Sequence, residues 1–449
     1  ILSSAATMIV AGAGQAADLP AAEPVDYVRV CDAFGTGYFF LPGTDTCLKM
    51  DGYVRAEMHW LDGDGPKEVK DYNNFSTRAR GRVRFDARTQ TDLGLLRSHI
   101  EMRGTIGPTP TGGYSDNFNI YAAWLSLSND AGTLTAGHHE SFYDFWDGYA
   151  TDTRIGLDDA TKETNLLAYT FDVGNGVSAS VSIEDKWVRR GGLAVGITTT
   201  AGGLTGIPAT TSAVTGAVRL TNEGQEIPDF VGNIRVEQSW GKAQVMGAVG
   251  RVGGAGFTAG TGATEPADND IGWAAGGGVH LKNMGPVEFV AQGDYAEGLV
   301  RYVTTGNGAE LYNSAYSASG NVDLTKAWSA RTSAKFGVAS DVALAVDFAY
   351  ASIDHRGLLE KEDFDTWALA GTIEWKPVSG LTFKTSVAYE EIVADSSAVV
   401  ILAFTALGAS MAMALPISTP PNAIAYSAGT FSTKQMALTG SIIAIAGLA

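Results

Sequence analysis

The segment from Arg78 to Arg88 alternates strictly between charged and small or apolar side chains. Arginine or aspartate holds every even position, and the positions between them are Ala79, Gly81, Val83, Phe85 and Ala87. A period of two is that of an extended strand whose two faces meet different surroundings. The segment is therefore expected to be a strand with one charged and one apolar face.

The same alternation recurs along most of the chain. It is clear in residues 49–60, 96–103, 177–184 and 342–350, within segments of about 10 to 14 residues. Strands of transmembrane barrels have this length and alternate between lipid and lumen. Strands of a soluble sandwich would be shorter and would face outside water on their polar side. The fold class expected is all-β, a transmembrane antiparallel β-barrel.

Connection lengths test this prediction independently, because such barrels alternate short turns with long loops. Short turns are expected near residues 90–92, 129–132, 174–176, 240–242, 283–286, 339–341 and 377–380. Long loops are expected near residues 61–74, 105–116, 140–163, 189–228, 253–269, 297–324 and 354–364. This order predicts fifteen strands up to Ile392, and a sixteenth is needed to close the sheet.

Composition agrees with an all-β chain and excludes one class of partner. The 449 residues include 55 glycines, with 10% aromatic and only 18% charged residues. The formal net charge is -18. Nucleic-acid binding needs clustered positive charge on an accessible face, so no nucleic-acid partner is expected.

The N-terminal part has the features of an exported protein. Residues 1–16 are small, apolar and uncharged, as in a signal peptide, and the missing Met predicts truncation at the start. Residues 17–46 are expected to form a periplasmic segment, and residues 47–392 the barrel. Cys31 and Cys47 are expected to form a disulfide rather than free thiols or a metal site, because the periplasm is oxidising and only His59 lies near them in sequence.

Residues 393–449 are atypical. They contain an 18-residue apolar run, Ala398–Leu415, which is long enough for a transmembrane helix. We favour instead a long last loop, with the closing strand within about 432–446. An altered reading frame or a variant of the fold are the alternatives.

One segment resembles a known family. Val28–Leu48 reads VRVCDAFGTGYFFLPGTDTCL, Gly52–Arg55 follows, and a weaker echo lies at Ile227–Gly241. In the spacing of its cysteines, glycines and Pro-Gly, the chain is similar to the alphaproteobacterial outer-membrane porin family. The resemblance implies a homotrimer of sixteen-stranded barrels whose third loop folds inward. The chain departs from the family in ending Gly447–Ala449 rather than in an aromatic residue.

A pore constriction is expected between the 140–163 loop and two neighbouring strands. The candidate acidic loop residues are Asp144, Asp147, Asp152, Asp158 and Asp159. The candidate basic wall residues are Arg78, Arg80, Arg82, Arg84, Arg97 and Arg103. Opposite charges across a narrow lumen would create a transverse field that orients water and polar solutes.

The function expected is passive diffusion of small hydrophilic solutes and ions across the bacterial outer membrane, with lipid and lipopolysaccharide around the barrel. No catalytic residue, metal or cofactor is expected. One alternative is a sugar-specific channel, which the ionic rather than aromatic lumen faces disfavour. A barrel enzyme would need a nucleophile beside His99 and Glu101, and a secreted adhesion protein would not need an apolar stripe on every strand.

Overall fold

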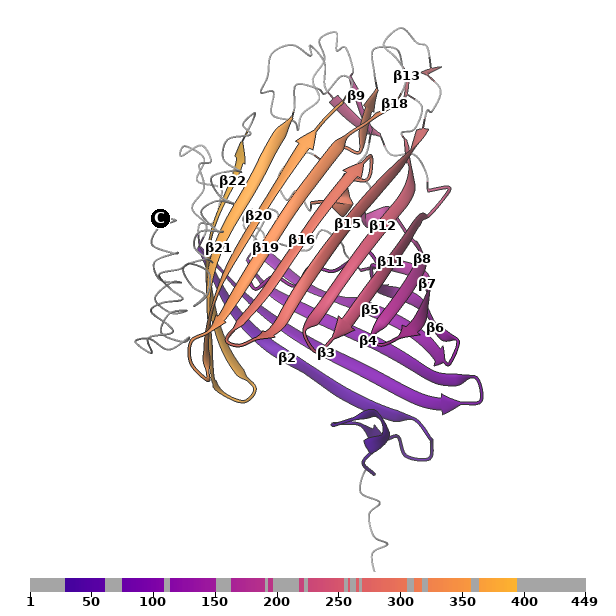
Figure 1. The fold of residues 1–449 in the computed structure, drawn as a ribbon, viewed down its shortest axis with the longest axis vertical. Helices are drawn as coiled ribbons and strands as arrows, with labels where there is room; N and C mark the ends of the chain where they lie inside the picture. Colours follow the sequence, from indigo (N-terminus) through magenta and orange to yellow (C-terminus); the bar gives the residue numbers. More distant parts are fainter. Residues whose placement is uncertain are drawn as a thin grey trace, which may run out of the picture.

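The computed structural model describes residues 29–60, 75–108, 114–150, 163–189, 193–196, 218–221, 225–253, 257–258, 264–265, 269–304, 311–316, 322–356 and 363–393. Their main element is one sheet of 16 strands in which every pairing is antiparallel, and the sheet curls into a barrel (Figure 1). Apart from the short β1, the strands follow one another around the barrel in chain order. The predicted fold class is confirmed.

Fifteen long strands make up the barrel wall, as predicted. They are β2 (Cys47–Trp60), β3 (Phe75–Thr91), β4 (Gly94–Pro108), β5 (Tyr114–Asn129), β6 (Gly132–Glu140), β7 (Glu163–Gly174), β8 (Val177–Glu184), β11 (Asp229–Gln238), β12 (Gly241–Gly253), β15 (Asn269–Met284), β16 (Val287–Glu297), β19 (Lys326–Gly337), β20 (Val342–Asp354), β21 (Phe364–Val378) and β22 (Leu381–Val393).

The remaining elements are short and lie at the two ends of the barrel. At the end with the short turns are η1 (Asp32–Phe34) and β1 (Phe39–Phe40). The long connections carry η2 (Trp187–Arg189), β9 (Leu193–Gly196), β10 (Val218–Thr221), β13 (Phe257–Thr258), β14 (Thr264–Glu265), η3 (Val300–Tyr302), β17 (Ser314–Tyr316) and β18 (Val322–Leu324). Figure 1 shows β9, β13 and β18 at the end opposite the short turns.

The two faces of the barrel strands differ as the alternation predicts. Apolar side chains project from the outer face, where Val54 is 89% exposed, Met58 82% and Val387 75%. Such exposure would be costly in water but suits a hydrocarbon environment. Among the described residues, no helix is long and apolar enough to cross a membrane.

The short turns lie where the sequence places them. In the connection from β7 to β8, Gly174, Asn175 and Gly176 have φ values of 92°, 55° and 74°. These left-handed conformations are accessible to glycine and asparagine and give tight reversals between antiparallel strands. The turn positions thus carry the residue types that the geometry requires.

The register of β5 contains one irregularity. Glu101 of β4 pairs with Ala122, whereas the next residue, Met102, pairs with Ile120. Tyr121 is therefore an extra residue in β5, a β-bulge that exchanges the faces on which the following residues lie. Apolar side chains occupy even positions before it, at Phe118 and Ile120, and odd positions after it.

Several predictions fall outside the described residues. These are the signal peptide at 1–16, the apolar run at 398–415 and the closing strand at about 432–446. Within the described part, β2 and β22 are the two terminal strands of the barrel wall. Arg55 of β2 and Lys384 of β22 interact electrostatically, so the first and last strands of the barrel wall lie near each other.

Candidate functional site

The arginines predicted for the basic wall lie on two adjacent strands. Register pairs Arg82 with Arg103 and Arg88 with Arg97, so their side chains share one face of the sheet. That face is the inner one, as a series of contacts shows. Arg97 lies over the Trp124 ring, and Trp124 contacts His139. His139 in turn stacks on Phe142, which belongs to the connection inside the barrel. We call the inner faces of β2, β3 and β4 the arginine wall.

Carboxylates bridge these arginines in pairs. Glu57 forms ion pairs with Arg55 at 2.9 Å and with Arg78 at 2.5 Å. Glu101 in the same way pairs with both Arg82 and Arg103. Like charges directly opposite each other destabilise a sheet, and a shared carboxylate removes that repulsion.

The same arrangement recurs near the short turns. Asp86 accepts hydrogen bonds from the Nε atoms of Arg88 and Arg97, both at 2.9 Å. Arg84 pairs separately with Asp51 at 2.5 Å. Arg80 donates to the Thr105 hydroxyl at 3.1 Å and has no carboxylate partner among the described residues.

The arginine wall still carries a net positive charge. Its described arginines are Arg55, Arg78, Arg80, Arg82, Arg84, Arg88, Arg97 and Arg103, and its described carboxylates are Asp51, Glu57, Asp86 and Glu101. The four carboxylates were not selected as site residues from the sequence. They alternate with apolar residues in the same way as the arginines, and this pattern places them on the same face of the sheet.

The connection after β6 enters the barrel, and we call its described part, residues 141–150, the inward loop. Its first residues are held by Glu184 of β8, which accepts hydrogen bonds from the Ser141 hydroxyl at 2.7 Å and the Phe142 amide at 2.9 Å. Arg189 of η2 pairs with the same carboxylate at 2.6 Å, with both side chains almost fully buried. The beginning of the loop is thus tied to the wall by charge-assisted hydrogen bonds.

The middle of the inward loop follows the inner faces of β12 and β15. Gln244 donates to the Asp144 carbonyl at 3.0 Å. Asp147 pairs with Lys242 at 2.6 Å and lies 3.2 Å from Nδ1 of His280. The Asp147 side chain is 48% exposed, so this carboxylate also faces the lumen.

The last described residues of the inward loop reach β16 and β20. The Tyr149 amide donates to Asp347 of β20 at 2.7 Å, and its hydroxyl donates to Glu288 of β16 at 3.0 Å. Contacts therefore extend from β8 to β20, on strands other than those of the arginine wall. Neither Gln244, Lys242 nor Asp347 was predicted as a site residue, because each meets the loop only through the folded barrel.

The structure describes two of the five predicted loop acids. Asp147 contacts side chains of β12 and β15, whereas the side chain of Asp144 interacts with Glu140 at the end of β6. Asp152, Asp158 and Asp159 lie outside the described residues. The ion pairs of Asp147 join it to Lys242 and His280, which lie on strands other than those of the predicted wall arginines.

The inner face is not purely ionic, which corrects one expectation. The rings of His99 and Trp124 stack at 5.1 Å, and the rings of Trp124 and His139 meet edge-on at 4.9 Å. Arg103 lies 3.0 Å from the centre of the Tyr121 ring. These inward-facing aromatic residues could not be predicted from a strict alternation, because the bulge at Tyr121 changes which residues of β5 face inward.

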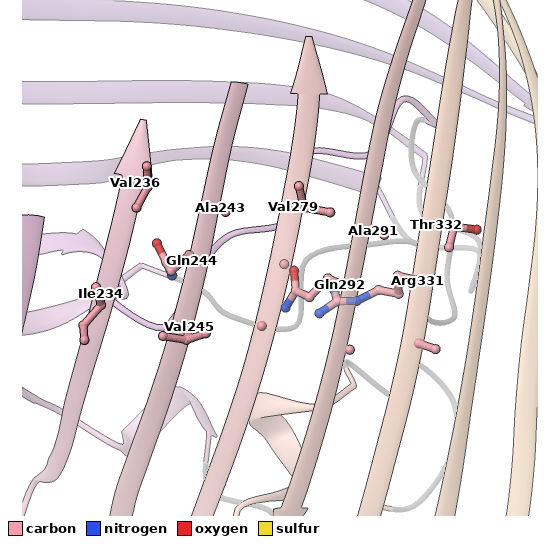
Figure 2. A pocket seen from close by; sticks show the side chains of 14 residues that line it. Ile234, Val236, Ala243, Gln244, Val245, Val279, Ala291, Gln292, Arg331 and Thr332 are labelled. Carbon is pink, nitrogen blue, oxygen red and sulfur yellow. The ribbon is translucent and has the colours of Figure 1, made fainter. Parts of the chain in front are cut away.

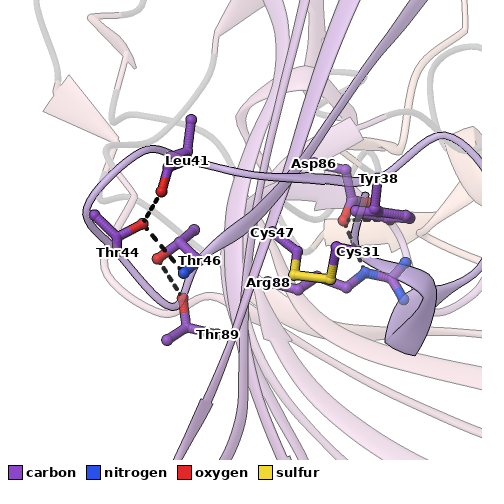
Figure 3. The surroundings of a disulfide bond; sticks show 9 residues. All are labelled: Cys31, Tyr38, Leu41, Thr44, Thr46, Cys47, Asp86, Arg88 and Thr89. Carbon is purple, nitrogen blue, oxygen red and sulfur yellow. Dashed lines mark hydrogen bonds and ion pairs between the residues drawn. A yellow bond between two sulfur atoms is a disulfide. The ribbon is translucent and has the colours of Figure 1, made fainter. Parts of the chain in front are cut away.

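The N-terminal segment is fixed to the short-turn end of the arginine wall. Cys31 and Cys47 form the predicted disulfide, with Cα atoms 6.0 Å apart (Figure 3). The Tyr38 hydroxyl donates to Asp86 at 2.9 Å, and burial together with this bond raises the pKa of the phenol. The Arg88 guanidinium lies 4.9 Å from the Tyr38 ring. The segment therefore packs on the charged face at the entrance of the lumen.

The histidines do not form a metal site in the described ranges, where no group of three or more His, Cys, Asp or Glu side chains could hold an ion. His99 lies 3.6 Å from Asp86 and stacks on Trp124, while Glu101 is held by arginines. The pair considered for a barrel enzyme is thus occupied by structural contacts.

Comparisons with known proteins give consistent matches. A family model described as "Porin subfamily" matches residues 18–410. Porin Omp2b of Brucella suis biovar 1 is 33% identical over 251 residues, which cover 54% of this chain and 62% of that relative. Porin Omp2a of Brucella melitensis biotype 1 is 34% identical over 204 residues, which cover 41% of this chain and 54% of that relative.

Among solved structures, a loop L8 deletion mutant of OmpT, an outer membrane protein of Vibrio cholerae, aligns with a TM-score of 0.44 and 12% sequence identity. The alignment covers 79% of this chain and 96% of that chain.

Proposed function

This chain belongs to the porin subfamily, and from that premise we propose that it forms a water-filled channel for passive diffusion of small hydrophilic solutes and ions. The membership confirms the resemblance drawn from residues 28–48. It identifies an outer-membrane protein of a channel family rather than an enzyme.

The observation that carries the proposal is the distribution of charge inside the barrel. The arginine wall has an excess of guanidinium groups on β2, β3 and β4. The inward loop lies against β12 to β20, with the half-exposed carboxylate of Asp147 among its side chains. One side of the described lumen therefore has an excess of positive charge, and a half-exposed carboxylate lies on the other side.

This uneven distribution of charge supports a transverse field across the constriction as part of the proposal. Such a field orients water and dipolar solutes, so a solute that cannot follow the orientation loses favourable hydration. Arginine suits the wall because its guanidinium stays charged when like charges are crowded, whereas lysine loses its proton more readily. Arg80, which has no described carboxylate partner, would contribute most directly to the positive side.

The partners proposed are lipid, lipopolysaccharide and two further copies of the chain. The apolar outer face, with side chains such as Val54, Met58 and Phe118, suits contact with acyl chains or with another barrel. A homotrimer is the assembly that the family resemblance implies.

Channel formation is tested by adding purified, refolded protein to a planar lipid bilayer. Stepwise increases in current of uniform size are the expected result, and a liposome-swelling assay should show faster uptake of small sugars than of large ones. Heat-modifiable migration on gels confirms that the barrel has assembled. Assembled protein that produces no current steps contradicts the proposal.

A sugar-specific channel is the second candidate, and one observation favours it. Trp124 and His139 form an aromatic row on the inner face, and aromatic surfaces bind sugar rings. Reversible block of the single-channel current by an oligosaccharide, lost in Trp124→Leu, would favour this function. A general diffusion channel should show no saturable block.

A further inference from the structure

Three consecutive glycines, Gly276–Gly278, lie in the middle of β15, where the inward loop crosses that strand. None of the three has a positive φ, so the backbone does not require glycine at these positions. Glycine in the interior of a strand costs stability and often marks the close approach of other groups. The groups that lie over Gly276 and Gly278 account for the absence of larger side chains there.

On the inner face, an aromatic ring of the inward loop occupies the space above Gly278. A Cβ added at Gly278 would lie 3.1 Å from Cγ of Phe145 and closer still to the Cδ1 and Cε1 atoms. Phe145 is 1% exposed, so its ring is fully enclosed at this position. The ring thus rests directly on the strand backbone.

A carboxylate and the hydroxyl group of a second aromatic residue lie above Gly276. A Cβ at this position would overlap Oδ1 of Asp294 and come within 2.9 Å of the Tyr143 hydroxyl. That hydroxyl donates to Asp294 at 3.3 Å, and Asp294 also pairs with Arg331 at 3.0 Å. Tyr143 and Phe145 are two residues apart, as are Gly276 and Gly278.

The polar groups beside the glycines hold the loop in place over them. Gln244 pairs in register with Gly278 on one side and Gln292 on the other, and Figure 2 shows both on the strands that flank β15. Gln244 donates to the loop backbone, and Lys242 lies 4.9 Å from the Phe145 ring.

The outer face at the same level is open. A hollow of about 650 Å³ is lined by small residues, among them Gly277, Gly293 and Ala243, with Val245 at its side. A Cβ at Gly277 would meet only the Gln244 carbonyl at 3.5 Å and Val245 Cγ1 at 3.7 Å, which are ordinary contacts. Gly277 therefore provides a matched control on the same strand.

We propose that Gly276 and Gly278 are positioning residues that make room for the Tyr143 hydroxyl group and the Phe145 ring and thereby set the aperture of the channel. We call these two positions the glycine seat. Because the inward loop rests on bare backbone, it lies as close to the wall as the chain allows and leaves the largest opening. The inference rests on the proposed channel function, since the aperture matters only if solutes pass.

The test compares single-channel conductance of Gly278→Ala with that of Gly277→Ala and the unmodified protein. A methyl group at position 278 has to displace the Phe145 ring into the lumen, so conductance should fall by roughly a factor of two, since flow depends on the narrowest section. Gly277→Ala should keep the original conductance. Adding Phe145→Ala to Gly278→Ala should restore conductance, because the methyl group then fills the vacated space.

The outcomes separate this inference from the proposed function. No channel activity in the assembled unmodified protein contradicts the function itself. Normal conductance in Gly278→Ala, or a decrease that Phe145→Ala does not reverse, overturns the glycine seat. If Gly278→Ala does not assemble, Phe145→Trp in the original background should lower conductance, because the larger ring lifts the inward loop from the strand, and an unchanged value there overturns the inference as well.

Discussion

Arg82 of β3 is paired with Glu101 of β4 on the inner face of the barrel. The same carboxylate also forms an ion pair with Arg103. Arg103 is the register partner of Arg82, so without Glu101 two positive charges would face each other directly. Glu101 therefore has two effects, since it stabilises the packing of the arginines and reduces the positive charge that a passing ion meets.

Replacing Glu101 with glutamine should make the channel more selective for anions. The substitution removes one negative charge and leaves Arg82 and Arg103 without their common partner. We expect the permeability ratio of chloride to potassium to rise roughly twofold, and the stability of the barrel to fall by about 1 kcal/mol. Reversal potentials in a salt gradient and urea unfolding measure the two effects.

Glu237→Gln provides a control for this prediction, because that carboxylate pairs with Arg235 near the short turns and is 65% exposed. It should change neither selectivity nor stability, as expected for an exposed ion pair. An equal shift in both variants would contradict a special role of Glu101.

Loss of the Asp147 carboxylate should loosen the inward loop. Asp147→Asn removes the ion pair with Lys242 and the contact with His280, both on the wall beneath the loop. Because Asp147 is half-exposed, the cost in stability should be small, about 1 kcal/mol. The expected result is noisier open-channel current and closure at lower voltage.

Recordings at several voltages check this prediction, with heat-modifiable migration as the measure of assembly. Noise and closing voltage equal to those of the unmodified protein would show that the remaining contacts, such as Gln244 with the Asp144 carbonyl, hold the loop unaided.

The disulfide should stabilise the N-terminal segment on the barrel. Cys31 and Cys47 are separated by 16 residues, and closing a loop of this size stabilises the folded state by about 3 kcal/mol in the chain-entropy account. Cys31→Ser with Cys47→Ser should therefore lower the unfolding midpoint in urea. It should also expose residues near Tyr38 to protease.

Reduction of the unmodified protein should reproduce both changes, and the barrel strands should stay protected. An unchanged midpoint after removal of the bond would mean that the Tyr38 contacts with Asp86 and Arg88 suffice to fix the segment.

The barrel could be predicted from the sequence because its strands carry a local signal. A strand such as β3 faces lipid on one side and water on the other, so apolar and polar side chains alternate along its consecutive residues. The short turns are also local, as Asn175 between two glycines shows. Even the bulge at Tyr121 leaves a trace, because apolar positions change from even to odd there.

The contacts of the inward loop could not be predicted in this way. Phe145 and Gly278 are distant in sequence and meet only because the sheet curls, so no pattern of consecutive residues joins them. The charge balance of the wall was missed for a different reason. Glu101 lies in the same alternation as the arginines, but its pairing depends on the register between β3 and β4.

We propose that the arginine wall sets the ion preference of a water-filled channel. The most direct test of this proposal is the reversal potential of the variant Arg80→Gln, Arg82→Gln, Arg84→Gln in a planar bilayer under a salt gradient. We expect a shift toward cation preference relative to the unmodified protein, because three positive charges leave the lumen. An unchanged reversal potential in an assembled, conducting variant would contradict it.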